Sequence, residues 1–232
     1  MADYGKIIVL NGPSSAGKTT LSRNLQKIWG RPLYYLSYDS VDWYMAPFGV
    51  TGYKRDYGID AVRDFLAVMY ESAAAICRSG RDVVIDNCLF DCEDIYKMSQ
   101  EIMAGCPVTM VRVKLPMDEL ERREIARGDR TPGKARWQEE HITPKEDDAY
   151  DVIVDTSGDS MECAREIKRY FDSYVYRKQR DDIIQKTTNR KTIQELFDRD
   201  KGEGKSEEID WGEDVGNEII AKKEEKTDIE IS

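Results

Sequence analysis

The sequence is poor in the residues that bind structural metals. It has one histidine, His141, and five cysteines among 232 residues, and no two cysteines form a CxxC pair. The closest two, Cys88 and Cys92, are four residues apart and lie far from His141. A structural zinc site takes four Cys or His ligands, so a site of that kind is not predicted. An odd number of cysteines without paired spacing favours reduced, mostly buried thiols in a reducing compartment.

Long apolar runs and an excess of positive charge are also absent. The apolar runs are far shorter than the roughly 20 residues that span a bilayer. The N-terminal Met-Ala-Asp-Tyr-Gly does not resemble a signal peptide. The formal net charge of −10 disfavours a nucleic-acid-binding protein, which normally carries a basic face. We therefore expect a cytoplasmic protein without a membrane or nucleic-acid partner, and nothing in the sequence predicts its oligomeric state.

The acidic residues are concentrated near the C-terminus. Residues 198–232 contain 13 acidic and 6 basic side chains, a net charge of −7. The apolar periodicity also fades after about residue 185. These changes predict an ordered domain over residues 1–185 and an acidic, flexible tail over 186–232. Two apolar islands, around Phe197 and Trp211, are either weakly ordered or dock on the domain or a partner.

Strand-like and helix-like segments alternate through the first part of the chain. Short apolar runs rich in β-branched residues predict buried strands at 6–11, 33–39, 82–87, 108–115 and 150–156. Apolar residues at helical spacing predict helices at 18–29, 59–79, 91–104, 117–127 and 161–185. This alternation predicts an α/β fold with a parallel sheet of about five strands and helices on both faces.

A glycine-rich motif lies between the first strand and the first helix. Residues 12–19, Gly-Pro-Ser-Ser-Ala-Gly-Lys-Thr, match GxxxxGK[ST] at every fixed position. In a P-loop, backbone N–H groups and the helix N-terminus bind phosphate, the lysine bridges the β- and γ-phosphates, and the threonine hydroxyl binds Mg²⁺. The motif predicts a P-loop NTPase fold that binds ATP and Mg²⁺. The residues expected to bind the nucleotide are Gly12, Pro13, Ser14, Ser15, Ala16, Gly17, Lys18, Thr19 and Thr20.

Two carboxylates follow apolar strands, where ligands of open α/β sheets bind. Asp86 ends the strand VVID and is expected to bind Mg²⁺ together with Thr19, unless it only caps the strand end. Asp39 follows the second strand and could accept the proton of an attacking hydroxyl. An N-cap of the next segment is the alternative for Asp39, and Asp42 is its neighbouring competitor for the catalytic role.

Aromatic residues are unusually dense in residues 38–57. They are interleaved with Gly and Pro and follow neither a helical nor a strand period. This composition suits a pocket for a flat organic acceptor. A satellite hydrophobic cluster under a long loop is the alternative interpretation.

Cations are concentrated at a predicted helix end over residues 121–130. Arg127 and Arg130 fall on the last turn and the loop beyond it, where a mobile lid would bring arginines to a transferring phosphoryl group. Arg122 and Arg123 fit a solvated helix face with i,i+4 ion pairs instead. The lone His141, in a polar helix, is interpreted as a surface residue in preference to a contact with substrate.

Several segments together resemble the chloramphenicol 3-O-phosphotransferase family. The resemblance covers about residues 6–170 and rests on IIVLNGPSSAGKTT, YDSVD, VVIDN, REIARGDRTPGKARWQ and YDVIVDTSGDSMECAREI. The ARGDR segment followed by YDxxVDT and ECAxxI is much more specific than the P-loop, which is common to many proteins.

The resemblance implies a small-molecule kinase with a lid, which transfers the γ-phosphoryl group of ATP to an antibiotic hydroxyl with Mg²⁺. It also implies that Asp39, at the Asp of the family's VDS motif, is the base and that Arg127 and Arg130 are the lid arginines. Asp86-Asn87 stands where the family has Asp-Asp, the segment after Asp39 carries more aromatics, and the tail has no counterpart. The resemblance therefore supports the phosphotransferase activity more strongly than it supports an antibiotic as the acceptor.

We expect a phosphotransferase that uses ATP and Mg²⁺, with Lys18, Asp39, Arg127 and Arg130 as its catalytic residues and a small hydroxyl-bearing acceptor. A kinase of nucleosides, sugars or nucleic-acid ends is a second hypothesis. A nucleotide-dependent switch with a partner-docking tail is a third, which a base and lid arginines disfavour because a switch needs neither.

Overall fold

The computed structural model describes residues 4–40, 53–128, 132–173 and 181–183, with the backbone alone for 53–61. The chain divides into two compact units, residues 1–190 and 191–232, and every described residue belongs to the first. The predicted tail, Asp42, Arg130 and residues 41–52 of the aromatic segment lie outside the described residues.

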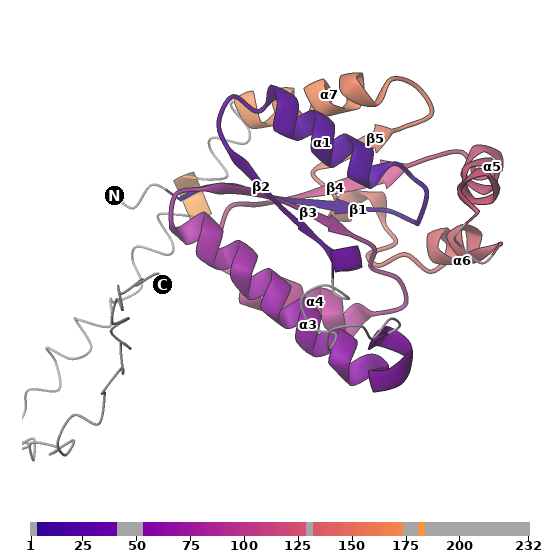
Figure 1. Ribbon diagram of the computed structural model, residues 1–232. Helices are drawn as coiled ribbons and strands as arrows, with labels where there is room; N and C mark the ends of the chain where they lie inside the picture. Colours follow the sequence, from indigo (N-terminus) through magenta and orange to yellow (C-terminus); the bar gives the residue numbers. More distant parts are fainter. Residues whose placement is uncertain (1–3, 41–52, 129–131, 174–180, 184–232) are drawn as a thin grey trace, which may run out of the picture. The chain divides into compact units, whose positions relative to one another are not determined.

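Five parallel strands form one sheet in the order β2-β3-β1-β4-β5 (Figure 1). The strands are β1 (Ile7–Asn11), β2 (Leu33–Ser37), β3 (Asp82–Asn87), β4 (Val108–Lys114) and β5 (Val152–Asp155). Every residue of β1 and β3 is buried, because both strands have neighbours on each side and helices on each face. The predicted α/β fold with five parallel strands is confirmed.

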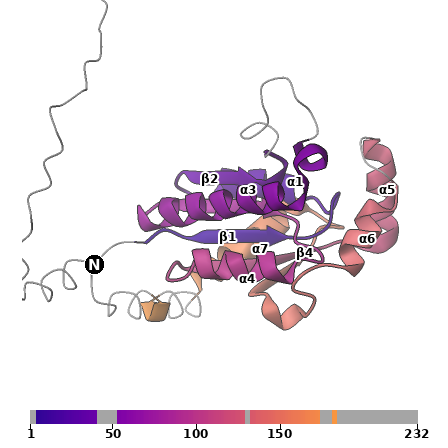
Figure 2. The ribbon, with the colours of Figure 1, turned by 90° about the horizontal axis from the view of Figure 1, so that it is seen from below.

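Helices cover both faces of this sheet. Figures 1 and 2 show α1 (Lys18–Ile28) and α7 (Ser160–Asp172) on one face and α3 (Tyr53–Arg78) and α4 (Glu93–Ile102) on the other. Figure 1 also shows α5 (Met117–Arg127) and α6 (Lys134–Glu140) beside the end of the sheet from which the P-loop emerges. Short 3-10 turns, η1 (Tyr38–Ser40) and η2 (Asp147–Ala149), precede α3 and β5. None of the described helices is long and apolar enough to cross a membrane.

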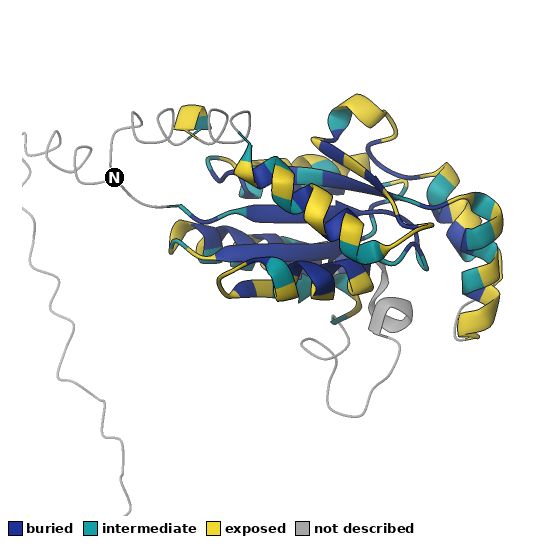
Figure 3. Cartoon of the chain, turned by 90° about the horizontal axis from the view of Figure 1, so that it is seen from above, coloured by how far each residue is buried: buried dark blue, intermediate teal, exposed yellow. Residues whose placement is uncertain are grey.

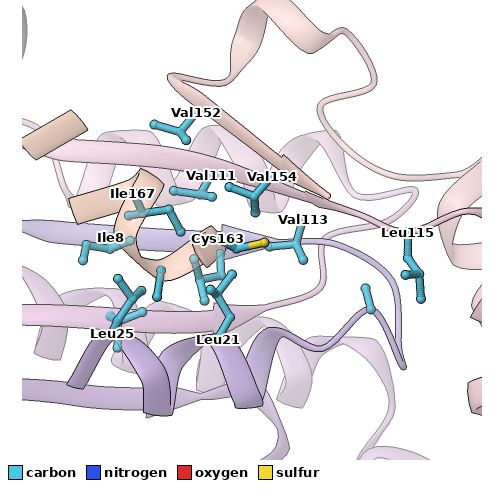
Figure 4. Packing of buried hydrophobic residues seen from close by; sticks show 14 of the residues in the cluster. Ile8, Leu21, Leu25, Val111, Val113, Leu115, Val152, Val154, Cys163 and Ile167 are labelled. Atoms are coloured by element: carbon cyan, nitrogen blue, oxygen red, sulfur yellow. The ribbon is translucent and has the colours of Figure 1, made fainter. Parts of the chain in front are cut away.

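The core is divided by the sheet into two clusters. Figure 3 shows the helices with buried faces toward the sheet and exposed faces toward solvent. On the α1 and α7 side, Figure 4 shows sheet residues packed against α1 and α7: Ile8, Val111, Val113, Val152 and Val154 meet Leu21, Leu25, Cys163 and Ile167. On the other side, α3 and α4 pack against residues such as Ile7, Val83 and Ile85. The described cysteines are all free thiols, as expected, and three of the five are buried.

Some predicted element bounds are wrong near the site. The second strand ends at Ser37, two residues early, because the chain turns into η1 and Asp39 N donates to Ser37 Oγ over 3.2 Å. The helix predicted from residue 91 begins at Glu93, because Asp91 has a φ of 45° that an α-helix does not allow. The long helix begins at Tyr53 and not at the predicted Ile59. The sequence did not predict this earlier start because the residues before Ile59 show no apolar face.

The last helix is also shorter than predicted. Helix α7 ends at Asp172, where Ser173 has an extended backbone with φ −75° and ψ 159°, and the described residues 181–183 of the predicted range are again helical. The apolar spacing also does not predict the bounds of α6. His141, predicted in a polar helix, is the residue that follows α6 at its C-terminal end.

Candidate active site

The P-loop connects β1 to α1 through two glycines that no other residue could replace without strain. A Cβ on Gly12 would lie 2.5 Å from the carbonyl oxygen of Val113 in β4, so the loop passes directly over that strand. Gly17 has a φ of +86°, in the left-handed region. The helix then begins at Lys18, and its first intrahelical hydrogen bond runs from Leu21 N to Gly17 O over 2.9 Å. The N–H groups of residues 18–20 precede that bond and point into the loop, as an anion site requires.

Lys18 is buried inside this loop. Its Nζ donates to the carbonyl oxygens of Gly12 and Pro13, each over 2.8 Å. These two carbonyls belong to the loop itself, so the ammonium group is held at the centre of the space that the loop surrounds. A charged donor in this position can neutralise phosphate oxygens.

Thr19 and Asp86, which the sequence suggests as magnesium ligands, are in direct contact. Thr19 Oγ1 donates to Asp86 Oδ2 over 2.7 Å, and the hydroxyl of Tyr35 reaches the same oxygen over 3.2 Å. The sheet register explains the pairing, because Leu10, two residues before the P-loop, lies opposite Asp86. Burial and the negative charge of Asp86 raise the pKa of Tyr35, which keeps this phenol a donor.

The donor set of this pair fits Mg²⁺ bound together with phosphates. Mg²⁺ takes one or two protein oxygens and completes its shell with phosphate oxygens and water. One hydroxyl and one carboxylate oxygen meet that requirement. No group of three or more His, Cys, Asp or Glu that could bind a metal occurs among the described residues.

A cleft of about 280 Å³, the P-loop cleft, opens above these residues. Its floor consists of loop and α1 residues from Ser14 to Thr20, and Asp39 and Asp86 line one side. Arg123 and Arg127 of α5 line it as well. The role of Arg127 as a lid arginine stays a prediction.

Arg123 has a larger role than the solvated helix face that its spacing suggests. Its Nε does pair with Glu119 over 2.8 Å at i,i+4 spacing, as expected. Its Nη2, however, donates to the carbonyl of Thr156 over 3.0 Å, and Thr156 Oγ1 donates to Ala16 O over 2.7 Å. Arg123 is thus tied to the P-loop through Thr156, the residue after β5, by contacts between distant segments that helical spacing cannot reveal.

A second, polar cavity adjoins the cleft, and we call it the junction cavity. It shares Ser14, Lys18, Asp39 and Asp86 with the P-loop cleft. It is also lined by Asn87, Cys88, Lys134 and Gln138. Asp39 is exposed to both spaces and lies on η1, directly after the end of β2. The predicted base and the P-loop lysine therefore face one common space.

An apolar cavity of about 260 Å³ continues from the junction cavity, with Tyr38 and Cys88 in both linings. Its other walls are mostly apolar, with Val62 and Leu66 from α3, Ile95 from α4, and Phe90 and Trp137. The rings of Phe90 and Trp137 meet edge to face with centroids 5.1 Å apart. Burial raises the pKa of the Cys88 thiol, so the wall stays neutral there.

Helix α6 lines both of these cavities and is anchored by buried polar contacts. Gln138 Oε1 accepts a hydrogen bond from Ser14 N of the P-loop over 2.8 Å. The next residue, Glu139, pairs with the buried Arg112 of β4 over 2.6 Å, although burial raises the pKa of Glu139. The loop and the helix opposite it are therefore fixed to each other.

Sequence reasoning missed Arg123, Lys134, Trp137 and Gln138 as cavity residues. For Lys134, Trp137 and Gln138, the signal available was only their place after the lid segment, because α6 contacts the P-loop through long-range packing. His141 stays a surface residue: it is exposed, and its ring stacks on Trp137 with centroids 4.6 Å apart. Arg130, outside the described residues, is not placed.

Comparisons with known proteins agree with this geometry. Residues 5–172 match the family described as chloramphenicol phosphotransferase-like protein. A Mycobacterium tuberculosis protein, provisionally named an O-phosphotransferase in strains CDC 1551 and H37Rv, is 29% identical over 194 residues, which are 74% of this chain and 84% of the relative.

Solved structures of P-loop kinases share the fold at low sequence identity. The Mycobacterium tuberculosis APS kinase in complex with AMPPNP and APS has a TM-score of 0.56 and 18% identity, over 73% of this chain and 99% of that one. The Acinetobacter baumannii shikimate kinase in complex with shikimate has a TM-score of 0.55 and 18% identity, over 72% and 93%. The Sinorhizobium meliloti gluconokinase has a TM-score of 0.52 and 19% identity, over 75% and 100%.

Proposed function

Because this chain belongs to the chloramphenicol phosphotransferase-like family, we propose that it transfers the γ-phosphoryl group of ATP to a hydroxyl group of a small organic acceptor. The observation that carries this proposal is that the junction cavity shares lining residues with both the P-loop cleft and the apolar cavity. Lys18, which faces the phosphates, and Asp39, the candidate base, line one space between the P-loop cleft and the apolar cavity. A kinase needs this order of parts: nucleotide, transfer point, acceptor.

The nucleotide end of the reaction uses the P-loop. Its N–H groups bind the phosphate oxygens, and Lys18 offsets negative charge that moves onto the β,γ-bridging oxygen of ATP, which leaves as a terminal oxygen of ADP. Bound through Thr19 and Asp86, Mg²⁺ would supply further charge neutralisation at the β- and γ-phosphates. Arg127 is placed on the cleft wall to neutralise the same charge from the lid.

The acceptor end uses Asp39 and the apolar cavity. Asp39 accepts the proton of the attacking hydroxyl and orients its oxygen toward phosphorus. The acceptor would lie with its hydroxyl in the junction cavity and its body against Tyr38, Phe90 and Trp137. That wall favours a compound with a flat or apolar portion over a polyol, whose hydroxyl groups would lose hydrogen bonds there. A hydroxyl-bearing antibiotic such as chloramphenicol fits this description, and so does an aromatic metabolite.

An acceptor screen tests the proposal. ATP consumption is measured with Mg²⁺ and a panel of chloramphenicol, other hydroxyl-bearing aromatic compounds, nucleosides and sugars, and products are identified by their gain of one phosphoryl group. We expect turnover with at least one aromatic alcohol and none with its analogue in which the hydroxyl is methylated. The Lys18→Ala variant provides the background. ATP binding without acceptor-dependent turnover across the panel would favour the nucleotide-dependent switch.

A further inference from the structure

One lysine that belongs neither to the P-loop nor to the predicted lid segment lines the junction cavity, where phosphoryl transfer is proposed to occur. Lys134 is the first residue of α6, is partly buried, and lines the junction cavity with Lys18 and Asp39. It lines neither the P-loop cleft nor the apolar cavity. In the part of the chain that the structure describes, its ammonium group has no hydrogen-bond or ion-pair partner.

The backbone on either side of Lys134 is fixed by one buried carboxylate. Glu124 of α5 is 2% exposed, and its two oxygens accept hydrogen bonds from Gly133 N and Ala135 N, each over 2.8 Å. One turn later, Gln138 holds the P-loop through Ser14 N. The lysine side chain is therefore presented from a rigid base, which keeps the cost of ordering it low.

The neighbours of Lys134 show that it shares its space with the P-loop lysine. Lys18 and Lys134 both lie close enough to Cys88 to lower the pKa of that thiol, against the larger effect of burial. Two ammonium groups that face one cavity repel each other, and an anion between them would relieve that repulsion. Arg123 and Arg127 line the P-loop cleft, whereas Lys134 lines the junction cavity and not the cleft.

We infer that Lys134 is a further catalytic residue, whose Nζ donates a hydrogen bond to the γ-phosphoryl group from the acceptor side. This inference rests on the proposed function. In the transfer step the acceptor oxygen forms a bond to the γ-phosphorus while the bond from that phosphorus to the β,γ-bridging oxygen breaks. The electron pair leaves with ADP, and the acceptor proton passes to Asp39. Lys134 holds the equatorial oxygens throughout and transfers no proton.

Nucleotide-binding measurements can distinguish a specific contact of Lys134 with the γ-phosphoryl group from a general effect of positive charge on α6. Isothermal titration with Mg²⁺ and either ADP or AMPPNP is run on the full chain and on Lys134→Met, Lys134→Arg and Arg136→Met. Arg136 is the matched control, because it lies on the same helix but points outward to Glu121 over 2.7 Å. We expect Lys134→Met to weaken AMPPNP binding about 10-fold while ADP binding changes less than about 2-fold. Lys134→Arg should keep most of the affinity, and Arg136→Met should resemble the wild type.

The other outcomes contradict the inference in distinguishable ways. A wild-type protein that binds neither nucleotide refutes the proposed function and this role with it. A wild-type protein that binds both, beside a Lys134→Met variant with unchanged affinities, refutes the role of Lys134 alone. An equal loss for ADP and AMPPNP would mean that the lysine acts through the P-loop or the fold. An unchanged AMPPNP affinity with a raised KM for the acceptor would place Lys134 on the acceptor and not on the phosphate.

Discussion

The P-loop cleft and the apolar cavity meet at one junction but are built in different ways. The floor of the cleft comes from one run of sequence, from Ser14 to Thr20, and its expected ligands are mainly backbone N–H groups. The apolar cavity takes its walls from η1, α3, the segment after β3, α4 and α6, and its lining residues are mostly apolar. Backbone recognition leaves little room for substitution. Side-chain walls can change their specificity while the fold and the nucleotide site stay the same.

Removal of the P-loop lysine should cause the largest loss of phosphoryl transfer, and it tests the proposed role of the P-loop cleft as the nucleotide site. We expect Lys18→Ala to lower phosphoryl transfer by at least about 10³-fold, because Lys18 is the charged donor that the loop carbonyls hold beside the phosphate site. Stability should change little, since Lys18 bonds only carbonyls of its own loop. Turnover and thermal unfolding are measured together, with the exposed Lys27→Ala of the same helix as control. Near wild-type turnover in Lys18→Ala would contradict the P-loop mechanism.

Asp39 lies at the boundary of the two spaces, so its replacement should affect transfer without affecting nucleotide binding. Asp39→Asn keeps the shape of the side chain but removes its basic oxygen. We expect turnover to fall about 10²-fold, near the lower end for loss of a general base, because a loose phosphoryl-transfer transition state needs little help from a base. The affinity for AMPPNP should stay within about 2-fold of the wild type, since Asp39 is not one of the groups that donate to phosphate.

Two results would move Asp39 to another role. Full turnover in Asp39→Asn would make it only a turn residue of η1 and would turn attention to Asp42. A collapse of nucleotide affinity would instead assign Asp39 to the magnesium site beside Asp86. Asp172→Asn, at the exposed end of α7, controls for the loss of one surface charge.

The same contrast explains what could be predicted from the sequence. The P-loop and its strand–helix context depend on local chemistry, and the contact between Thr19 and Asp86 agrees with the expectation that these two residues lie together. Their role in binding Mg²⁺ stays a prediction. Gln138, Lys134 and Trp137 reach the cavities only because Arg112 and Ser14 anchor α6 over more than 25 residues of sequence separation. Such packing leaves no periodic signal. Arg123 shows both cases, since its i,i+4 pair was predictable and its bond to Thr156 was not.

A substitution of Trp137 tests the proposed role of the apolar cavity as the acceptor site. Its side chain is 41% exposed and lies on the apolar cavity against Phe90. We expect Trp137→Ala to raise the KM of an aromatic acceptor about 10-fold, through loss of one aromatic contact, and to leave the KM of ATP within about 2-fold. His141→Ala is the control, because His141 stacks on Trp137 from outside the cavity. An equal rise in the KM of ATP and the KM of the acceptor would mean that the P-loop cleft and the apolar cavity do not bind their substrates independently.

The smallest effect on nucleotide binding is expected at Glu119, the α5 residue that pairs with Arg123 of the cleft lining. Hydrogen bonds from Arg122 and Arg123 lower the pKa of Glu119 from 4.5 to about 2. A carboxyl whose pKa is lowered in the folded state binds fewer protons than in the unfolded state between these two values. Its contribution to stability is therefore fully present above about pH 4.5 and is lost as the pH falls toward about 2.

Glu119→Gln should accordingly flatten the acid side of the stability profile and shift nucleotide affinity slightly at neutral pH. Urea unfolding at a series of acidic pH values measures the first change, and titration with AMPPNP measures the second, which we expect to be about 2-fold because Arg123 loses one of its two anchors. Glu162→Gln is the matched control: arginines on α7 also lower the pKa of Glu162, and α7 does not line the P-loop cleft. That variant should flatten the acid profile in the same direction and leave nucleotide affinity unchanged. If both variants weakened AMPPNP binding equally, the Glu119–Arg123 pair would have no specific role in the wall of the cleft, and Arg127 alone would carry the lid charge.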